Sequence, residues 1–357
     1  MSFDKRDLSN AYDQYIDENE PVAKERTLND KVLVVDGLNT FIRAFSVNPA
    51  LNEDGVHIGG LIGFLKSIRH AINKINPTRC VIVFDGKDGS KSRRKIYPQY
   101  KAQRKVKSRL NRNVDWSTTP VDEQAAMAQQ ISRLVNYLEQ LPVKILSLDG
   151  TEADDVMAYL AVTIFKKDVT LMSTDKDFLH LVNERIAVWS PTKSKMYDEQ
   201  AVKDEFGVIP QNLLTWRTLD GDKSDNIAGI RGAGLKTVKK CFPEITEDKL
   251  FTVKDLIDTY SGVDHKYKLQ ESVLKNVDTI KRNYLLMQLY DVDIGNRKKL
   301  MLQNSFASNA ETLVKFEFQK MFIKDKLWGS IPNLDSWMLE FVRLNNFLKK
   351  ETNEQTK

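Results

Sequence analysis

The sequence predicts an α/β protein in which a central, mostly parallel sheet has helices on both faces and is followed by a helical second half. From about residue 29 to 198, short apolar segments of strand length alternate with segments whose apolar residues recur at helical spacing. The strand segments are apolar throughout, as in sheets that are buried on both faces. Beyond about residue 199, helical periodicity and glycine-containing turns replace the strand pattern.

Length and composition are those of a folded globular protein of two domains, or of one large domain with an appendage. The chain has 357 residues, of which 41% are hydrophobic and 29% are charged. Its apolar stretches are far shorter than the roughly 18 residues of a membrane span. The first residues lack an apolar signal core, so we expect a cytoplasmic protein with no membrane partner. The two cysteines and four histidines lack the spacing of a disulfide framework or a zinc site, so any metal should be a hard cation bound by oxygens.

The first domain is expected at 29–198, after a polar N-terminal arm at 1–28. The expected strands are 31–35, 79–84, 143–148, 169–173 and 186–189, and the expected helices are 61–72, 122–141 and 152–165. Pro142 ends the second of these helices, and Thr151 is the expected N-cap of the third. Strands that alternate with helices form βαβ units, which predict parallel pairing.

The second half divides into a helical region at 199–300 and a helical C-terminal extension at 301–357. Within the extension, residues 311–327 and 335–349 have apolar side chains at helical intervals, with tryptophans near their ends. This pattern favours packing against the rest of the protein over recognition of a ligand.

Carboxylates fall where the expected strands end. Seven of them follow four separate strands: Asp36, Asp85, Glu152, Asp154, Asp155, Asp175 and Asp177. Since the carboxyl ends of parallel strands meet at one edge of a sheet, we expect these acids to gather there. Asp222 and Asp225, in the tract GDKSDN, add two acids from the second half. So many like charges repel one another unless cations neutralise them, which predicts a site for Mg²⁺ or Mn²⁺.

Two such ions roughly 4 Å apart are the arrangement that hydrolyses phosphodiesters, because one activates water and the other stabilises the leaving oxygen. A simpler interpretation applies to each acid alone, since an Asp after a strand is commonly a helix cap or turn residue. Calcium loops and sugar-nucleotide enzymes also use Asp-x-Asp. The joint occurrence of nine acids beside a basic segment favours phosphoryl transfer.

The basic segment runs from Lys87 to Arg112 and contains eleven Lys or Arg and one acid, whereas the whole chain has a net charge of only +5. Arg93, Tyr97, Lys101 and Arg104 recur at intervals of four, four and three, which predicts one face of a helix if Pro98 is accommodated. Cations bind phosphates and tyrosines stack on unpaired bases, so the segment indicates nucleic-acid binding. A solvated helix with its tyrosines packed inward remains the alternative.

A glycine-rich turn, Gly229–Lys240, is the second nucleic-acid candidate. A Gly-x-Gly turn that opens a helix resembles the hairpin of a helix-hairpin-helix motif, in which backbone N–H groups approach a phosphate. Its spacing fits neither a Walker loop nor a dinucleotide-binding loop. An ordinary glycine-rich turn is the simpler alternative.

Taken in order, these motifs resemble the 5′-nuclease family, which includes flap endonucleases, the 5′ to 3′ exonuclease domain of bacterial DNA polymerase I and the phage ribonuclease H enzymes. The resemblance covers about residues 31–245 and rests on VVDGLNTFIRAF, VIVFDG, SRRKIYPQYKAQR, TEADDVMAYLA, STDKDFLHL and LDGDKSDNIAGIRGAG. The tract WSPTKSKMY further resembles the T-even-type phage ribonuclease H branch. The resemblance implies a PIN-like nuclease core with a basic arch or clamp at about 87–120.

The resemblance also implies roles for single residues. The first metal site would be held by Asp36, Asp85, Glu152 and Asp154, and the second would be held or surrounded by Asp155, Asp175, Asp177, Asp222 and Asp225. Arg93 and Lys101 would act on the scissile phosphate. Nucleic-acid contacts would come from Arg94, Tyr97, Tyr100, Arg104, Lys105, Lys107, Gly229, Gly232, Gly234, Lys236 and Thr237.

The resemblance therefore implies a nuclease with two Mg²⁺ ions, for which Mn²⁺ substitutes, and a monovalent cation at the glycine-rich turn. Its expected substrates are DNA and RNA:DNA hybrids with 5′ ends or flaps, and its activities are removal of RNA primers and cleavage of DNA flaps. We expect a monomer in a phage-infected bacterial host, with a replication single-strand-binding protein as a further partner. A non-catalytic DNA-binding protein and a single-strand ribonuclease of the PIN type are the rival hypotheses.

Overall fold

The computed structural model describes residues 26–103, 109–306 and 311–355. Its centre is a six-stranded sheet in the order β3-β2-β1-β4-β5-β6. The strands are β1 (Lys31–Asp36), β2 (Arg79–Asp85), β3 (Lys144–Leu148), β4 (Asp168–Met172), β5 (Ile186–Ser190) and β6 (Lys195–Tyr197). All neighbours are parallel except β6, which pairs antiparallel with β5. The predicted fold class is confirmed, and β6 is an edge strand that the apolar pattern did not predict.

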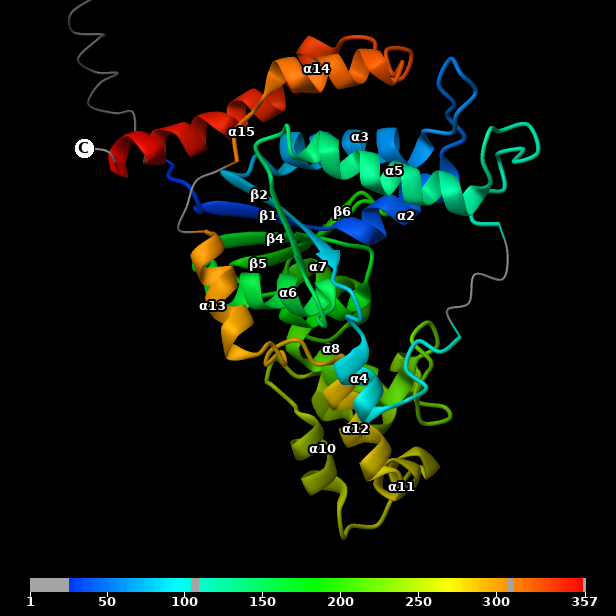
Figure 1. The fold of residues 1–357 in the computed structure, drawn as a ribbon. Helices are drawn as coiled ribbons and strands as arrows, with labels where there is room; N and C mark the ends of the chain where they lie inside the picture. The colour runs from blue at the N-terminus through cyan, green and yellow to red at the C-terminus, as the bar shows by residue number, and fades with distance from the viewer. Residues whose placement is uncertain (1–25, 104–108, 307–310, 356–357) are drawn as a thin grey trace, which may run out of the picture.

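Helices cover both faces of the sheet (Figure 1). One layer contains α2 (Gly37–Val47), α3 (Gly59–Ile75), α5 (Glu123–Leu138), α14 (Lys315–Lys324) and α15 (Leu334–Gln355). The other contains α6 (Ala153–Tyr159), α7 (Glu199–Phe206) and α13 (Asn296–Ser305). Alternation along β1 separates two hydrophobic cores, since Val32 and Val34 face the second layer while Leu33 and Val35 face the first.

A group of helices extends from the second layer, away from the sheet (Figure 1). It comprises α8 (Pro210–Asp220), α9 (Leu235–Cys241), α10 (Val253–Tyr260), α11 (Lys268–Lys275) and α12 (Val277–Met287). Two short antiparallel strands, β7 (Gly221–Asp222) and β8 (Ile227–Ala228), hold the GDKSDN tract between α8 and α9. None of the described helices is long and apolar enough to cross a membrane.

The C-terminal helices pack on the first layer through a shared apolar core. Phe318 of α14 and Phe341 of α15 are fully buried, in the same cluster as residues of α3 and α5. Asp325, between the two helices, accepts hydrogen bonds from Arg133 and Tyr137 of α5. Burial of aromatic side chains is the main stabilising term in such a contact.

Two local expectations were wrong. The basic helix does not continue to Arg104, because α4 (Lys91–Ile96) ends before Pro98. The residue that precedes a proline is driven out of the helical region, and Tyr97 is extended, with φ −141° and ψ 97°. Thr151 is not the N-cap of α6, since Glu152 occupies that position and makes no side-chain capping bond.

Candidate active site

The parallel strands bring the acids to one edge of the sheet. Asp36 and Asp85 end the neighbouring strands β1 and β2, and Asp175 follows β4 on the other side of β1. The loop after β3 returns to this edge, because Asp85 Oδ1 accepts a hydrogen bond of 2.8 Å from the backbone N–H of Ala153. Asp85 thus supplies the capping contact at the start of α6 that Glu152 does not make.

Four acids at this edge form no ion pair within the described part of the chain. One of them, Asp85, caps α6; the other three, Asp36, Asp154 and Asp175, are called here the unpaired group. Asp36 is buried, and it accepts hydrogen bonds from Asn39 N and Ser173 Oγ at 3.0 and 3.1 Å. Burial raises the pKa of Asp36 to about 7, and the charges of Asp85 and Asp175 add to the rise.

Asp154 and Asp175 show the same electrostatic stress. Burial raises the pKa of Asp154 well above its usual value, with further contributions from the charges of Asp175 and Asp36. Burial likewise raises the pKa of Asp175, although its carboxylate accepts a hydrogen bond from the backbone of Asp177 at 2.9 Å. The unpaired group is therefore a place where negative charge accumulates without a compensating cation.

Four other acids accept hydrogen bonds from cationic side chains within the described residues: Glu152, Asp155, Asp177 and Asp222, called here the paired group. Arg93 donates through Nη1 to Glu152 Oε2 at 2.5 Å and forms a bidentate pair with Asp155 at 2.7 and 2.8 Å. Lys101 Nζ lies 2.5 Å from Glu152 Oε1. Burial alone would raise the pKa of Glu152, but Arg93 and Lys101 bring it below its usual value.

Arg217 of α8 binds the other two members of the paired group. Its Nε and Nη2 lie 3.0 and 2.8 Å from Asp177 Oδ1, and Nη2 lies 2.6 Å from Asp222 Oδ2. Burial still raises the pKa of Asp177 to about 7, with Asp175 adding to the rise and Arg217 opposing it. Asp225 lies beside Lys101 at 4.0 Å and accepts a hydrogen bond from Tyr100.

The donor set suits a hard divalent cation, because every acid offers carboxylate oxygens and the unpaired group lacks positive charge. Within the described residues, however, no three or more His, Cys, Asp or Glu side chains are arranged to hold a metal ion. Four of the carboxylates are turned to arginine and lysine instead. The chemistry of the residues present fits a divalent ion, while their arrangement is that of a cluster partly neutralised by arginine and lysine side chains of the chain.

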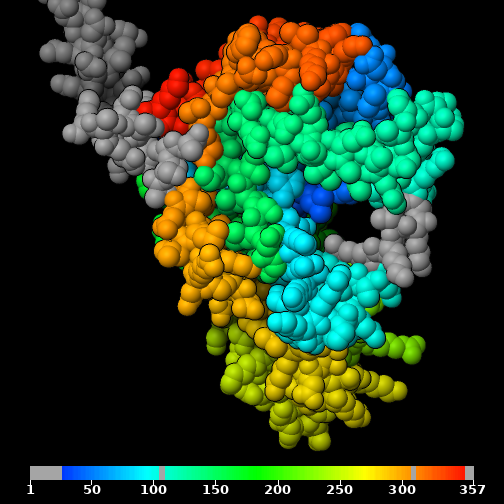
Figure 2. All heavy atoms as spheres, in the orientation of Figure 1, coloured from blue at the N-terminus to red at the C-terminus, as the bar shows by residue number. Residues whose placement is uncertain are grey.

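The base of the basic segment is fixed to α12. Arg93 Nε donates to the carbonyl of Leu286 at 2.9 Å, and the Arg282 guanidinium lies 4.4 Å from the ring centroid of Tyr97. These contacts hold α4 over the acid edge. Figure 2 shows a hollow in the surface between α4 with its following turns, drawn in cyan, and the first layer of helices. Atoms of the β1–α2 part of the chain, drawn in blue, are visible behind it.

The residues expected to bind nucleic acid from this segment differ in exposure. Arg94 is exposed and Tyr97 is half-buried. Tyr100 is buried, at 2% exposed, and its hydroxyl donates to Glu152 Oε2 at 3.1 Å and Asp225 Oδ2 at 3.0 Å. A buried ring has no free face on which a nucleobase could stack. In this structure Tyr100 is therefore packed inward, which is the alternative interpretation of the basic segment. Three further candidates lie outside the described residues: Arg104, Lys105 and Lys107.

The glycine-rich turn leads from β8 into α9. Gly229 has no room for a side chain, because a Cβ atom there would lie 2.0 Å from the carbonyl oxygen of Asp220. Gly232 has φ +87°, and Gly234 is the N-cap of α9. All five candidates for nucleic-acid contact in this turn are exposed: Gly229, Gly232, Gly234, Lys236 and Thr237. The turn is open to solvent on the side that these residues present.

Sequence reasoning missed Arg217, Ser173 and Asn39. The available signal for Arg217 was a single basic residue in the last turn of a helix that leads directly into the acids of GDKSDN. Asn39 accepts a hydrogen bond of 2.9 Å from Thr174, which ties the start of α2 to the loop after β4. Asn39 and Ser173 thus help to position Asp36, since the backbone of Asn39 and the hydroxyl of Ser173 both donate to its carboxylate.

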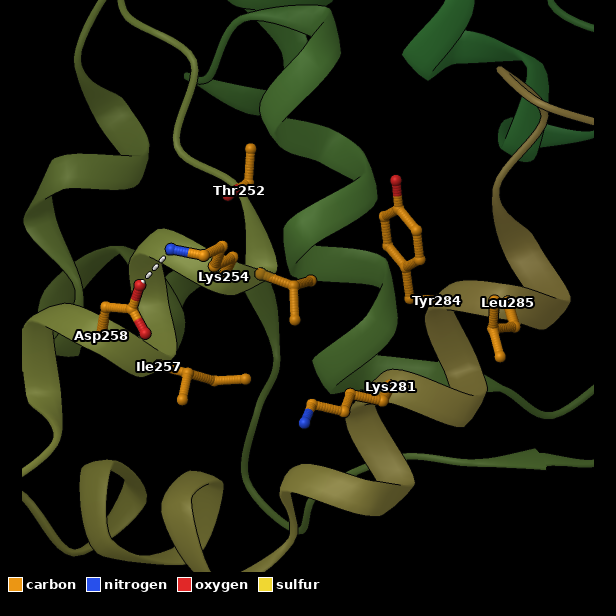
Figure 3. Close-up of a pocket in the computed structure, with 8 residues that line it drawn as sticks. Thr252, Lys254, Ile257, Asp258, Lys281, Tyr284 and Leu285 are labelled. Carbon is orange, nitrogen blue, oxygen red and sulfur yellow. Dashed lines mark hydrogen bonds and ion pairs between the residues drawn. The ribbon is translucent and has the colours of Figure 1, made fainter.

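A separate cavity of about 700 Å³ lies between α10 and α12 (Figure 3). Its lining includes Ile257, Tyr284 and Leu285, with an ion pair between Lys254 and Asp258 at 2.6 Å. No acid of the strand-end cluster lines this cavity. It belongs to the helical region and not to the acid site.

Comparisons with known proteins agree with this architecture. Residues 31–207 match the model of the 5′-3′ exonuclease, N-terminal resolvase-like domain. A 5′-3′ exonuclease of Aquifex aeolicus is 30% identical over 279 residues, covering 72% of this chain and 91% of the relative. A 5′-3′ exonuclease of Bacillus subtilis is 32% identical over 234 residues, covering 62% and 73%.

Among solved structures, the D15 flap endonuclease of bacteriophage T5, in a complex with DNA and metal ions, has a similar fold. The TM-score is 0.57 at 20% identity, and the match covers 83% of this chain and 99% of the phage protein. At this identity the likeness concerns the fold, including the helical region that follows the sheet.

Proposed function

Since the chain belongs to the 5′-3′ exonuclease family, we propose that it is a divalent-metal-dependent 5′ nuclease that hydrolyses phosphodiesters near the junction of a 5′ single strand and a duplex. The observation that supports the proposal most is the acid cluster. Acids from four strand ends and from GDKSDN meet beneath a basic segment that is fixed over them. A phosphodiester that approaches this edge meets both cationic side chains and carboxylates.

The first metal site would be held by Asp36, Asp85, Glu152 and Asp154. The second would be held or surrounded by Asp155, Asp175, Asp177, Asp222 and Asp225. Bound ions of this class supply an activated water and stabilise the leaving oxygen. Mg²⁺ is the proposed ion, with Mn²⁺ as a substitute and a monovalent cation at the glycine-rich turn.

The cationic residues of the chain act on the phosphate itself. Arg93 and Lys101 each lie 2.5 Å from Glu152, so their positive charges are in direct contact with the acid cluster. A phosphate that accepts hydrogen bonds from these two groups is oriented toward the acids, and its negative charge is balanced there. Hydrolysis in line would leave a 5′ phosphate and a 3′ hydroxyl.

The proposed substrates are DNA flaps and RNA primers in RNA:DNA hybrids, which places the enzyme in DNA replication. Binding would use the exposed Arg94 and the exposed residues of the glycine-rich turn, including Lys236 and Thr237. We propose a monomer of the phage ribonuclease H type, with a replication single-strand-binding protein as a further partner.

The test uses the full chain with a labelled 5′-flap DNA duplex and a labelled 5′-RNA primer hybrid, each in Mg²⁺, Mn²⁺ or chelator. Cutting near the junction or release of short 5′ products only with metal is the expected result, and the ratio of the two rates gives the substrate preference. Tight binding without cutting in either metal would contradict the proposal and favour a non-catalytic DNA-binding protein.

A further inference from the structure

Arg217 is a cation built into the acid cluster. It comes from α8, outside the sheet, and its side chain is only 13% exposed. All its polar nitrogens are used: Nε and Nη2 on Asp177 Oδ1, Nη2 also on Asp222 Oδ2, and Nη1 on the carbonyl of Gly221 at 3.2 Å. The guanidinium is thus fixed by both charge and geometry.

The position of the guanidinium matters more than its charge. Nη2 lies between two carboxylate oxygens, 2.8 Å from Asp177 Oδ1 and 2.6 Å from Asp222 Oδ2. Asp222 Oδ1 already accepts hydrogen bonds from Ser224 and the backbone of Asp225, so Oδ2 is the oxygen that this side chain offers to a cation. A cation that bridges Asp222 Oδ2 and Asp177 Oδ1 would occupy the same space as Nη2. The nitrogen and such an ion therefore exclude each other.

We propose that Arg217 is a resident counter-ion that competes with a divalent cation for Asp177 and Asp222, and so sets the metal concentration at which the second site fills. The inference rests on the proposed function, because it concerns the second of the two proposed metal sites. Before metal binds, Arg217 neutralises two of the clustered acids and stabilises the fold. Binding of the ion requires the guanidinium to release them, which weakens metal affinity.

A bracing role makes the opposite prediction. If Arg217 only held Asp177 and Asp222 in place for an ion, its removal would weaken metal binding. Competition predicts tighter binding, since removal frees two carboxylates and takes one positive charge out of the site.

The experiment measures Mn²⁺ binding to the full chain by isothermal titration calorimetry without nucleic acid, and thermal unfolding in chelator. In the R217Q variant we expect the weaker Mn²⁺ site to bind about tenfold more tightly, and the chelated protein to melt at a lower temperature. R217K, whose ammonium cannot bridge two carboxylates in the same way, should show a smaller gain, and it provides the same comparison if R217Q does not fold.

The control is R185Q. Arg185 is also part-buried, but among the described residues its side chain donates to the backbone carbonyls of Ala161, Val162 and Phe165 and to no carboxylate. Its loss should lower stability without changing Mn²⁺ affinity. Unchanged or weaker Mn²⁺ binding in R217Q and R217K would overturn the competition and leave the nuclease proposal standing. A wild-type chain that binds no Mn²⁺ would overturn the metal-dependent function together with this inference.

Discussion

The paired and unpaired groups of acids lie at the same sheet edge, yet the chain treats them differently. In the paired group, arginine and lysine from α4, α8 and the turn after α4 bind Glu152, Asp155, Asp177 and Asp222. In the unpaired group, Asp36 and Asp175 accept hydrogen bonds only from neutral groups within the described residues, and Asp154 forms no ion pair there. Burial raises the pKa of all three, and it also raises the pKa of Asp155 and Asp177 despite their arginine partners. The chain neutralises one part of the cluster with its own arginine and lysine side chains and leaves the other part without a counter-charge.

This difference separates acids that hold the fold together from acids that oppose it. A buried ion pair leaves a costly charge behind when one partner is removed, so the paired acids and their cations stabilise one another. Clustered carboxylates without a counter-charge store repulsion, which an external cation would relieve. Substitution should therefore have opposite effects on stability in the two groups.

The largest expected effect is on catalysis, from the unpaired group. In D154N, loss of one carboxylate from the proposed first metal site should lower the cleavage rate by at least about 10³-fold. The metal-free protein should be as stable as wild type or more so, because a repelling charge is removed. Single-turnover cleavage of a 5′-flap duplex and urea unfolding in chelator measure the two effects. D248N, at an exposed acid, is the matched control; cleavage by D154N at the rate of D248N would contradict the assignment.

The paired group should respond in stability. R93Q leaves the buried Glu152 and Asp155 without their arginine and the Leu286 carbonyl without its donor, so we expect a loss of about 3 kcal/mol in the free energy of unfolding. Denaturant unfolding in chelator measures it. The exposed neighbour provides the control, because R94Q should change stability by less than about 0.5 kcal/mol. Equal stability of R93Q and R94Q would show that the ion pairs do not hold α4 in place.

Stability of the metal-free protein should also depend on pH in a direction set by the unpaired group. The folded-state pKa of Asp36 is raised from 3.8 to about 7, so the folded state binds the proton more tightly than the unfolded state does. That stabilisation is complete below pH 3.8 and is lost as pH rises through 7. Buried His180, whose pKa burial lowers to about 3, opposes the trend only below about pH 6.5.

In chelator, the free energy of unfolding should therefore fall between pH 6.5 and 8 by about 0.8 kcal/mol from Asp36 alone. Asp177, whose pKa is also raised to about 7, adds a similar fall. Mg²⁺ at pH 8 should restore the loss, since it binds the ionised acids of the folded state. Urea unfolding at both pH values, with D36N as the comparison, gives the slope, which should be flatter in the variant. A stability that rises with pH over this range would show that the unpaired acids are not under strain.

The sequence predicted the gathering of the acids but not their pairing. Asp36, Asp85 and Asp175 follow apolar strands, and parallel pairing necessarily brings such strand ends to one edge. The end of α4 before Pro98 was also within reach of local rules. Which cation meets which acid depends on how α8 and α12 pack, and contacts such as Arg217 with Asp222 or Arg93 with the Leu286 carbonyl leave no periodic signal.

Substitution of Tyr100 should have the smallest effect. It tests whether the tyrosines of the basic segment bind nucleic acid or pack inward. The Tyr100 hydroxyl donates to Glu152 and Asp225, so Y100F should lower the free energy of unfolding by about 1 kcal/mol while the ring stays packed. Affinity for a 5′-flap duplex in chelator should not change, because the buried ring has no face for a base. Fluorescence anisotropy measures that affinity, with Y97F as the control at a half-buried ring. Y100F removes only the hydroxyl, so the test also needs Y100L, which removes the aromatic ring. Weaker DNA binding in folded Y100L but not in Y100F would show that the ring of Tyr100 contacts nucleic acid. Unchanged DNA binding with lower stability in both variants would show that Tyr100 supports the paired acids.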